Sequence, residues 1–596
     1  MKSDNYKITQ YSVSSILNYV ENSQIAIPEI QRPFVWKGEE VRALIDSLYE
    51  GYPIGYLIVW QNSQVRVRGF GKGGTKKILI DGQQRVTALM AALLGKEVLD
   101  EQYQSCRIRI AFNPLAQTGD ERFAVCDEKH EQDSKWIPDI SIFFRRDFSF
   151  RQFEKEYKEA NPGEDFTPLE ESVDTLKEIV KHQVGVIELS FLLDIDVVSE
   201  IFIRINLQGK PLNQEDFVMS KISVNEEYGG DYIRNCIDYF CHLLREPSFY
   251  QVLQQNETDF FNSEYGQAVA WCQNGEKNLY IPSYADVLKV VLISYFGKVR
   301  IGDLVHLLSG RTGEKKGLTK KEISKKLSEE SFEKLGAGVK AFVCEKNFKG
   351  FQKALKKAGY CCSRLLYSQS VLNYCYAMYL LMDRQGIGEE EKESLLARWM
   401  TMVMLTGHYQ SGGEGTVLKD YANATEEGFA SYLAQIEELK LTEEFYDSIL
   451  PDKFASTTAR TARFLVYVAT QCARGVHSLY SDVTIEELYK NKTESYQILP
   501  KTYLAKCGYK TREIYGQVAN LTYISKETKD IVKRKAPADY REKLEEVIGR
   551  EAITASLQEN GLTEKIFTAG EKDVTKILAD RRKQMALEIK EFYKTL

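Results

Sequence analysis

The sequence predicts an α+β multi-domain protein, and three changes of pattern along its 596 residues support this prediction. Short runs of strand-forming residues alternate with helical segments up to about residue 225. Long aromatic segments with helical periodicity then dominate, and the last 100 residues again mix short elements. We expect an α/β domain over 1–225, a helical middle domain over 226–400 and a mostly helical C-terminal domain over 401–596.

Apolar spacing, glycine and proline place the elements of the first domain. One helix is expected around Val13 to Glu21, and another ends before Gly51. Pro28 and Pro33 keep residues 25–36 extended. Buried strands are expected at residues 56–60, 77–80, 106–114 and 184–190, and a helix that stops at Gly95 follows residues 81–82. In the middle domain, the clearest helical segments are 232–244, 284–296, 370–385 and 393–410.

The charge balance and the metal-binding residue types exclude several classes of protein. Lys plus Arg is 79 and Asp plus Glu is 85, so the net charge is −6 and a uniformly basic nucleic-acid binder is excluded, although a local basic patch is not. No apolar run of about 18 residues and no secretory pattern occurs, so we expect a cytoplasmic protein without a membrane span. The 11 Cys are scattered and no two of the 6 His have ligand spacing, so no local metal site is expected.

The most informative segment is Ile78-Leu-Ile-Asp81-Gly82-Gln83-Gln84-Arg85, where a strand leads through an Asp-Gly turn into a helix. The first backbone N–H groups of such a helix and its dipole favour an anion. Gly82 allows close approach of a phosphate, and Gln83 and Gln84 are neutral hydrogen-bond donors. Arg85 has a charged, planar guanidinium whose N–H groups suit phosphate oxygens. Asp81 could accept a ribose hydroxyl, hold Mg²⁺ or orient water. The structural alternative is a helix start at which Asp81 is the cap and Arg85 pairs with an acid.

Two further segments carry polar residues that could contact a ligand. Residues 27–36 alternate apolar residues with Glu29, Gln31, Arg32 and Trp36, and the alternative is an aromatic edge strand with an exposed ion pair. Residues 201–213 place Arg204 and Asn206 on one face if the segment is extended. A purely structural role is an equal alternative there.

Taken together, the strings IPEIQRPFVW, IDGQQRVTAL and IFIRINLQGKPL resemble, in the same order, the GmrSD-like family of type IV (modification-dependent) restriction and phage-defence proteins. RWMTMVMLTGHYQSGGEGTVLKD is similar to the helical middle of that family, and ILPKTYL, VANLTYIS and KAPADY are similar to its C-terminal domain. The resemblance implies a ParB/sulfiredoxin-like first domain that binds and hydrolyses a nucleotide. Asp81 and Arg85 would then be catalytic, with Gln31, Arg32, Gly82, Gln83, Gln84, Arg204 and Asn206 as nucleotide-binding residues.

The resemblance also implies an HNH-like ββα nuclease element in the C-terminal domain, but its chemistry is degenerate in this chain. The paired His of the family correspond to Tyr496 and Gln497, and neither activates water near neutral pH. Asn520 matches the central Asn, whereas the later Asn falls at Lys529, a cation on the side of the metal. We therefore expect no metal bound there and a fold that persists without cleavage.

Two features outside these motifs are candidates for ligand contact. Lys533, Arg534 and Lys535 form a basic run that could bind DNA phosphates, and a longer run extends from Arg311 to Lys326. The glycine-rich segment 408–415 after a helix could contact phosphate or the first domain, with a plain loop as the alternative.

We therefore predict a nucleotide-dependent anti-phage defence protein that senses DNA, with GTP, ATP or CTP and Mg²⁺ as cofactors. Its partners would be DNA and a separate nuclease or defence-system subunit, and an oligomer is compatible with the sequence. The alternatives are an active type IV restriction endonuclease with a divergent metal site, or a non-catalytic module that binds DNA or protein.

Overall fold

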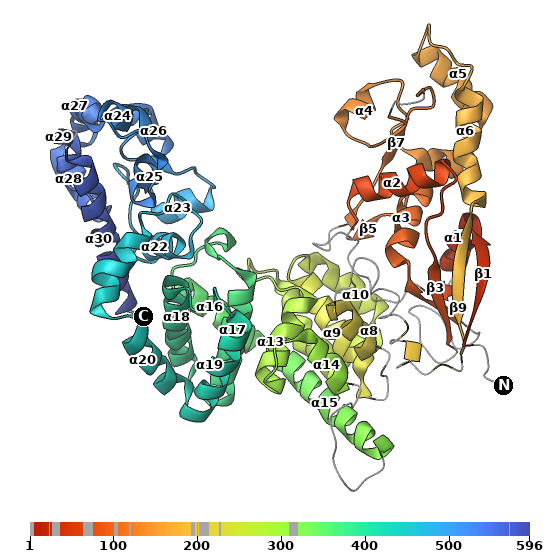
Figure 1. Cartoon of the computed structure of the whole chain (residues 1–596), viewed down its shortest axis with the longest axis horizontal. Helices are drawn as coiled ribbons and strands as arrows, with labels where there is room; N and C mark the ends of the chain where they lie inside the picture. The colour runs from red at the N-terminus through yellow and green to blue at the C-terminus, as the bar shows by residue number, and fades with distance from the viewer. Residues whose placement is uncertain are drawn as a thin grey trace. The chain divides into compact units, whose positions relative to one another are not determined.

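The computed structural model describes residues 5–22, 24–26, 36–62, 76–99, 105–117, 121–191, 193, 197–198, 201, 214–223, 225, 228–308, 320–570 and 572–596. The chain divides into two compact units, Met1–Arg234 and Asn235–Leu596. The first combines a small mixed sheet with helices, and the second is mostly helical (Figure 1). The predicted α+β multi-domain class is confirmed, while the division into three domains stays a prediction.

A five-stranded mixed sheet forms the centre of the first unit. Its strands, in spatial order, are β1 (Tyr6–Ser12), β9 (Gln183–Leu189), β3 (Leu57–Asn62), β4 (Lys76–Asp81) and β2 (Ile25–Ala26). β3 runs antiparallel to β4 and parallel to β9, and β2 runs parallel to β4 with Ala26 opposite Ile78. The chain therefore leaves β2 at the same end of the sheet at which β4 reaches Asp81.

Three helices pack their apolar sides against one face of this sheet. They are α1 (Val13–Glu21), α2 (Gly38–Tyr49) and α3 (Gln83–Leu94), and their boundaries agree with the prediction. The last one ends at Gly95, whose φ of 68° is the left-handed conformation that glycine adopts most readily. Buried residues of the helices and the sheet form one core, which includes Val13, Ile16, Val41, Leu44, Leu57, Val59, Leu79, Val86, Leu89 and Val186.

The predicted continuous strand over residues 106–114 is wrong. β6 (Ser105–Cys106) pairs with β5 (Val98–Leu99), whereas β7 (Ile110–Phe112) pairs with β8 (Phe123–Val125), so one apolar run serves two separate hairpins. Between them Arg107 donates to Asp139 Oδ2 over 2.7 Å. The other elements of the first unit are α4 (Glu128–Gln132), η1 (Ile140–Phe144), α5 (Phe150–Ala160), α6 (Leu169–Glu178), η2 (Ile179–Lys181) and α8 (Gln214–Ser223).

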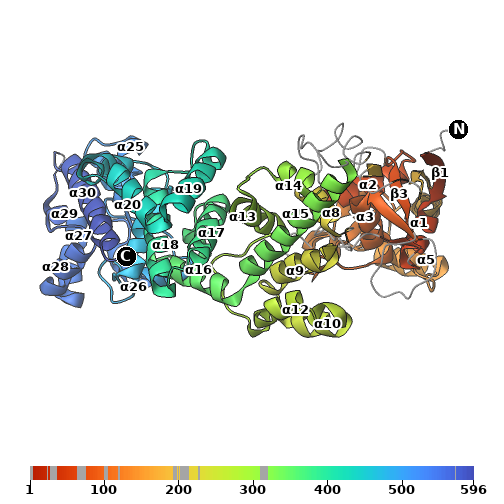
Figure 2. The ribbon, with the colours of Figure 1, turned by 90° about the horizontal axis from the view of Figure 1, so that it is seen from below.

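The second unit begins within α9 (Gly230–Leu243) and contains the predicted long apolar helices. Of these, α17 (Gln369–Arg384) and α18 (Glu389–Thr406) lie beside α16 (Glu345–Lys357), as Figure 2 shows. Trp399 and Tyr376 are fully buried among them. The remaining helices up to the C-terminal region are α10 (Tyr250–Asn256), α11 (Thr258–Phe261), α12 (Glu264–Val269), α13 (Tyr284–Phe296), α14 (Ile301–Leu308), α15 (Lys320–Val343), α19 (Gly413–Glu427), α20 (Phe429–Lys440), α21 (Leu450–Lys453) and α22 (Ala462–Ala473).

The C-terminal region has its own apolar core and a minimal two-stranded sheet. β10 (Tyr496–Gln497) pairs antiparallel with β11 (Leu521–Thr522), and α26 (Lys526–Val532) follows, which is the β-β-α order that the sequence predicts. The helices around it are α23 (Ile485–Lys490), α24 (Lys501–Lys506), α25 (Arg512–Tyr515), α27 (Pro537–Ile548), α28 (Arg550–Glu559), α29 (Lys565–Thr568) and α30 (Val574–Tyr593). Over the described residues, no helix combines the length and apolar character that a membrane crossing requires.

Candidate functional site

The turn between β4 and α3 is built around a glycine. Gly82 is the N-cap of α3 with φ 92° and ψ 11°, a left-handed conformation. A Cβ on Gly82 would overlap Leu57 Cδ2 and lie 3.3 Å from Arg85 Nη2. The backbone conformation and the packing of Leu57 therefore both require glycine here, which is a different reason from the phosphate approach that the sequence suggests.

Arg85 connects this turn to the segment that precedes β3. Its Nη2 lies 3.1 Å from Asp81 Oδ2, and its Nη1 donates to the carbonyl oxygen of Ile54 over 2.9 Å. The side chains of Arg85 and Asp81 are 18% and 26% exposed, so the pair lies at the surface of the turn. Gly55 makes room for the guanidinium, because a Cβ there would lie 2.7 Å from Nη1. The acid that pairs with Arg85 in the structural alternative is thus Asp81 itself.

The other half of that alternative, capping by Asp81, does not occur. The N-cap of α3 is Gly82, which has no side chain, so no side-chain cap is made from that position. Gln83 turns back instead and donates to the carbonyl of Leu79 over 3.1 Å. The turn therefore places a helix N-terminus with no side-chain cap beside the Arg85 guanidinium. Two of the five N–H groups of that guanidinium donate to Ile54 and Asp81. That combination suits an anion with several oxygens.

The core-facing side of the sheet also carries a buried polar cluster centred on Glu188, which the sequence reasoning missed. Glu188 is 2% exposed. Lys77 Nζ lies 2.6 Å from its Oε1, Lys7 Nζ lies 2.9 Å from its Oε2, and Tyr11 donates to Oε1. Burial alone would raise the pKa of Glu188, but hydrogen bonds from Lys7, Lys77 and Tyr11 outweigh it and lower the pKa to about 2. The partners are far apart in the sequence, so no local signal could have found the cluster.

Four other predicted residues of the nucleotide site cannot be placed against this geometry. Gln31, Arg32, Arg204 and Asn206 lie outside the described residues. Gln84 is half-buried in the first turn of α3. Their assignment to the nucleotide stays a prediction.

In the C-terminal region, Asn520 lies directly before β11 and is fully buried. Its Oδ1 accepts from the backbone N–H of Leu499 over 2.9 Å. Its Nδ2 donates to the carbonyl of Leu499 over 2.9 Å and to that of Tyr515 over 3.0 Å. The carboxamide therefore fastens the backbone after β10 to the loop before β11, and its polar atoms are occupied by main chain.

The residues that correspond to the nuclease His pair and the later Asn also have structural surroundings. The Tyr496 hydroxyl is buried without a hydrogen-bond partner among the described residues, and burial raises its pKa to about 12. Gln497 Nε2 donates to the carbonyl of Tyr515 over 3.1 Å. Lys529 is exposed on α26. A search of the described residues for three or more His, Cys, Asp or Glu side chains arranged to hold a metal ion finds none.

A basic stretch begins where α26 ends. Lys533, Arg534 and Lys535 are all exposed, and no carboxylate in the described part of the chain pairs with them. Lys526 and Lys529 are exposed on the preceding helix, so this end of the C-terminal region can present several cations to a polyanion. Residues 311–319 of the longer basic run lie outside the described residues.

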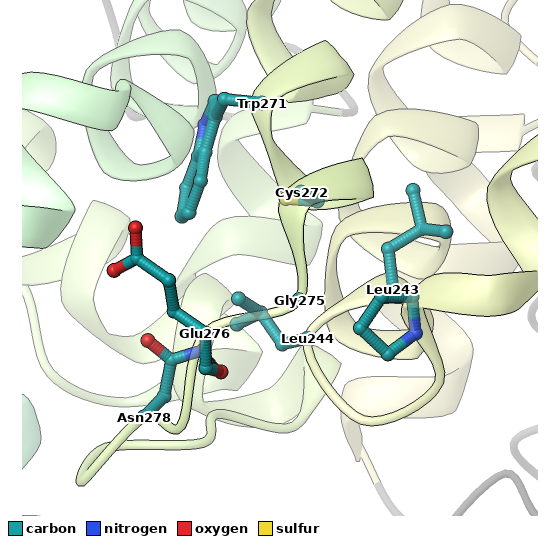
Figure 3. Close-up of a pocket in the computed structure, with 8 residues that line it drawn as sticks. Leu243, Leu244, Trp271, Cys272, Gly275, Glu276 and Asn278 are labelled. Carbon is teal, nitrogen blue, oxygen red and sulfur yellow. Dashed lines mark hydrogen bonds between the residues drawn. The ribbon is translucent and has the colours of Figure 1, made fainter.

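A small cavity in the second unit, shown in Figure 3, is lined in part by a glutamate. It measures about 10 Å³ and is lined by Trp271, Glu276, Asn278 and five neighbours. Glu276 is already paired with Lys349 over 2.7 Å. The cavity has room for about one water molecule and none for a substrate.

Comparison with protein families identifies the first unit. Residues 13–223 match the family model described as the GmrSD restriction endonuclease, N-terminal domain. The matched range contains four of the five strands of the sheet, all except β1, together with the Asp81–Arg85 turn. A search of curated proteins finds no match.

Proposed function

Because the chain carries the GmrSD N-terminal domain and is thereby a GmrSD-like restriction and phage-defence protein, we propose that this domain binds and hydrolyses a nucleoside triphosphate as the chain senses DNA. One observation carries the proposal. The N-terminus of α3 has no side-chain cap in the described structure, and the Arg85 guanidinium is fixed beside it by contacts of 2.9 and 3.1 Å. A pre-positioned cation next to a helix N-terminus costs little reorganisation when a phosphate binds.

Each residue of the turn has a distinct role in this proposal. The first N–H groups of α3 and the outer N–H groups of Arg85 hold phosphate oxygens. Asp81 keeps one carboxylate oxygen on Arg85, and its other oxygen orients water or holds Mg²⁺, which would neutralise phosphate charge when bound. Gln83 and Gln84 border the phosphates, and Gln31, Arg32, Arg204 and Asn206 supply the remaining contacts.

Nucleotide binding and turnover by the purified chain test this assignment. Arg85→Ala should weaken binding of GTP, ATP or CTP by about tenfold or more, because it removes a charge-assisted contact of roughly 1.5–3 kcal/mol. Lys96→Ala is the matched control, since Lys96 is 53% exposed just beyond the opposite end of α3. Equal triphosphate affinity in wild type and Arg85→Ala would refute the site.

Asp81→Asn separates the chemical role from the structural one. If Asp81 orients water or metal, the change should reduce hydrolysis more than binding, because an amide keeps one acceptor for Arg85 but loses the charge. Unchanged turnover would leave Asp81 as a structural partner of Arg85 alone.

We further propose that the C-terminal nuclease element no longer cuts DNA. The support is local: the Tyr496 hydroxyl is buried with a raised pKa, and the Asn520 carboxamide is saturated by main chain. His477, the nearest histidine upstream, is engaged with Glu559 over 3.2 Å. Incubation of modified and unmodified plasmid with Mg²⁺ or Mn²⁺ and each nucleotide should give no nicking. Robust cleavage would favour the alternative, an active type IV endonuclease with a divergent metal site.

DNA recognition is assigned to the basic stretch after α26. Reversal of charge at Lys533, Arg534 and Lys535 should weaken DNA binding for all sequences and flatten its salt dependence, because each lost phosphate contact removes about one unit of log–log slope. Reversal of Lys572, Lys576 and Lys583 changes the same number of charges in the following segment and is the control. Salt-independent binding would favour a protein partner, such as a separate nuclease or defence subunit.

A further inference from the structure

A second cavity in the second unit lies where three helices begin. Its volume is about 380 Å³, within the range of small-molecule sites. It is formed by the starts of α17, α19 and α22, the end of α18 and the turn between α18 and α19. The lining residues that matter here are Ser368, Ser370, Tyr374, Tyr409, Gly413 and Ala462.

The helix starts give the cavity a positive electrostatic character. α17, α19 and α22 have 16, 15 and 12 residues, and each contributes residues of its first turn to the lining. Thr461 caps α22, but within the described structure no side chain caps α17 or α19. Three N-terminal dipole ends that meet at one cavity favour a negatively charged occupant.

Two of the negative groups around the cavity are already engaged. α18 ends there, but the carbonyl of Val403 accepts from the N–H groups of Gly407 and His408 over 3.0 and 3.1 Å. Glu414 also lines the cavity, and its Oε1 lies 3.5 Å from Lys289 Nζ. These contacts reduce the repulsion that an incoming anion would meet.

An arginine without a described acidic partner lies next to one of the lining residues. Arg463 follows the first residue of α22, and its Nη2 would lie 3.2 Å from a Cβ on Gly407, a lining residue. Across the described ranges, no carboxylate pairs with Arg463. Burial lowers its pKa, so the charged guanidinium lacks part of its hydration and gains from an anionic partner.

The cavity also has an aromatic side. The rings of Tyr374 and Tyr409 meet edge to face, 5.1 Å apart. Tyr409 is 8% exposed, and its hydroxyl is buried in the fold near Asp420. The adjacent His408 is anchored, with Nε2 2.8 Å from Asp420, so the segment from 408 onward is held in place at its start.

We propose that this cavity binds a phosphate monoester of mononucleotide size, with the phosphate at the starts of α17 and α19 near Arg463 and the apolar part against the tyrosine rings. The sequence leaves the glycine-rich segment 408–415 open between contact with a phosphate, contact with the first domain and a plain loop, and the cavity favours the phosphate contact. The site is formed entirely within the second unit and is independent of the triphosphate site proposed at Asp81–Arg85.

Calorimetric titration of the full chain with GMP, guanosine and inorganic phosphate tests the proposal. GMP should bind at one site, and Arg463→Gln should weaken it by about tenfold or more, because a charge-assisted contact is lost. Ser370→Asp places a negative charge at the exposed start of α17 and should weaken GMP to a similar extent without touching Arg463. Arg550→Gln, at an exposed arginine on α28, and Arg85→Ala should leave GMP affinity unchanged.

The outcomes discriminate clearly. Inorganic phosphate that matches GMP, with no binding of guanosine, would support the phosphate site and assign free phosphate as its source. Tighter binding of GMP than of phosphate would assign the nucleotide. The proposal fails if GMP does not bind, or if Arg463→Gln and Ser370→Asp both bind GMP as tightly as the wild type does. It also fails if Arg85→Ala abolishes GMP binding. Melting curves for each variant confirm folding, and Ser370→Asp decides the outcome if Arg463→Gln unfolds.

Discussion

The β4–α3 turn of the first unit and the β10–β11 region of the second both join short strands to a helix, yet they use their polar residues in opposite ways. At the first, Arg85 and Asp81 are 18% and 26% exposed, and the helix start has no described side-chain cap. At the second, Asn520 is fully buried and all its bonds go to main chain. A residue that satisfies the backbone completely has little capacity left for a ligand.

The comparison gives a physical criterion for retained chemistry in a divergent domain. At the first turn, the polar atoms can form further hydrogen bonds and are accessible to solvent. At the second, the asparagine that matches a nuclease position is fully accounted for by the fold. The same residue type can therefore persist in a sequence because it holds two loops together, with no need for catalysis.

The largest effect should come from Asn520→Ala. The change leaves the N–H and carbonyl of Leu499 and the carbonyl of Tyr515 without their partner in a buried site, so the second unit should lose roughly 3–5 kcal/mol of unfolding free energy. Chemical denaturation measures this loss. Asn491→Ala, at an exposed helix end, is the control and should change stability by less than about 1 kcal/mol. A stable Asn520→Ala variant would contradict the structural role.

Glu188 allows the same test inside the first unit, because it too is a buried polar group occupied by the fold. Its folded pKa of about 2 lies below the usual value, so its stabilising contribution is present above about pH 4.5 and is lost as pH falls toward 2. Glu188→Gln should cost on the order of 1–3 kcal/mol at neutral pH and remove this acid dependence. Denaturation of the wild type and of Glu188→Gln at several values from pH 7 to pH 3 measures the loss of stability and its pH dependence. If the two chains lose stability with falling pH in the same way, the ionic role of the Glu188 cluster is refuted.

Arg85→Ala should show the reverse balance between stability and function. We expect a loss of about 1–2 kcal/mol in unfolding free energy, from the contacts to Asp81 and Ile54, alongside the larger loss of triphosphate binding. Arg85→Lys should recover little of either, because an ammonium cannot span both partners as a planar fork does. If Arg85→Ala loses several kcal/mol of unfolding free energy and still binds nucleotide normally, the role of Arg85 is structural, as that of Asn520 is.

The smallest effect is expected for Tyr496→Phe. The Tyr496 hydroxyl has no partner among the described residues, so its removal should leave stability unchanged or raise it by up to about 1 kcal/mol. Thermal melting detects this shift. A clear loss of stability would reveal a hydrogen bond at this hydroxyl, and a change in DNA cleavage would show that the position still acts in chemistry.

Much of the first unit could be predicted from local patterns. The spacing of Val13, Ile16 and Leu17 and the glycine at position 95 place two helices within a residue of their observed bounds, because one apolar face and a left-handed cap are local properties. The run 106–114 misled the prediction, since strand-forming residues do not specify a pairing partner. Family-like strings also located the Asp81–Arg85 turn before its geometry was known.

By itself, the sequence determined the fold class, the helix that begins after Gly82 and the residue types available at the candidate sites. Only the tertiary structure decided which of these residues can still form hydrogen bonds to a ligand. Glu188 meets Lys77 across 111 residues, Asn520 meets Leu499 across 21, and three helix starts meet at one cavity. Such contacts follow from how distant segments pack, and packing depends on the whole core and not on any local pattern.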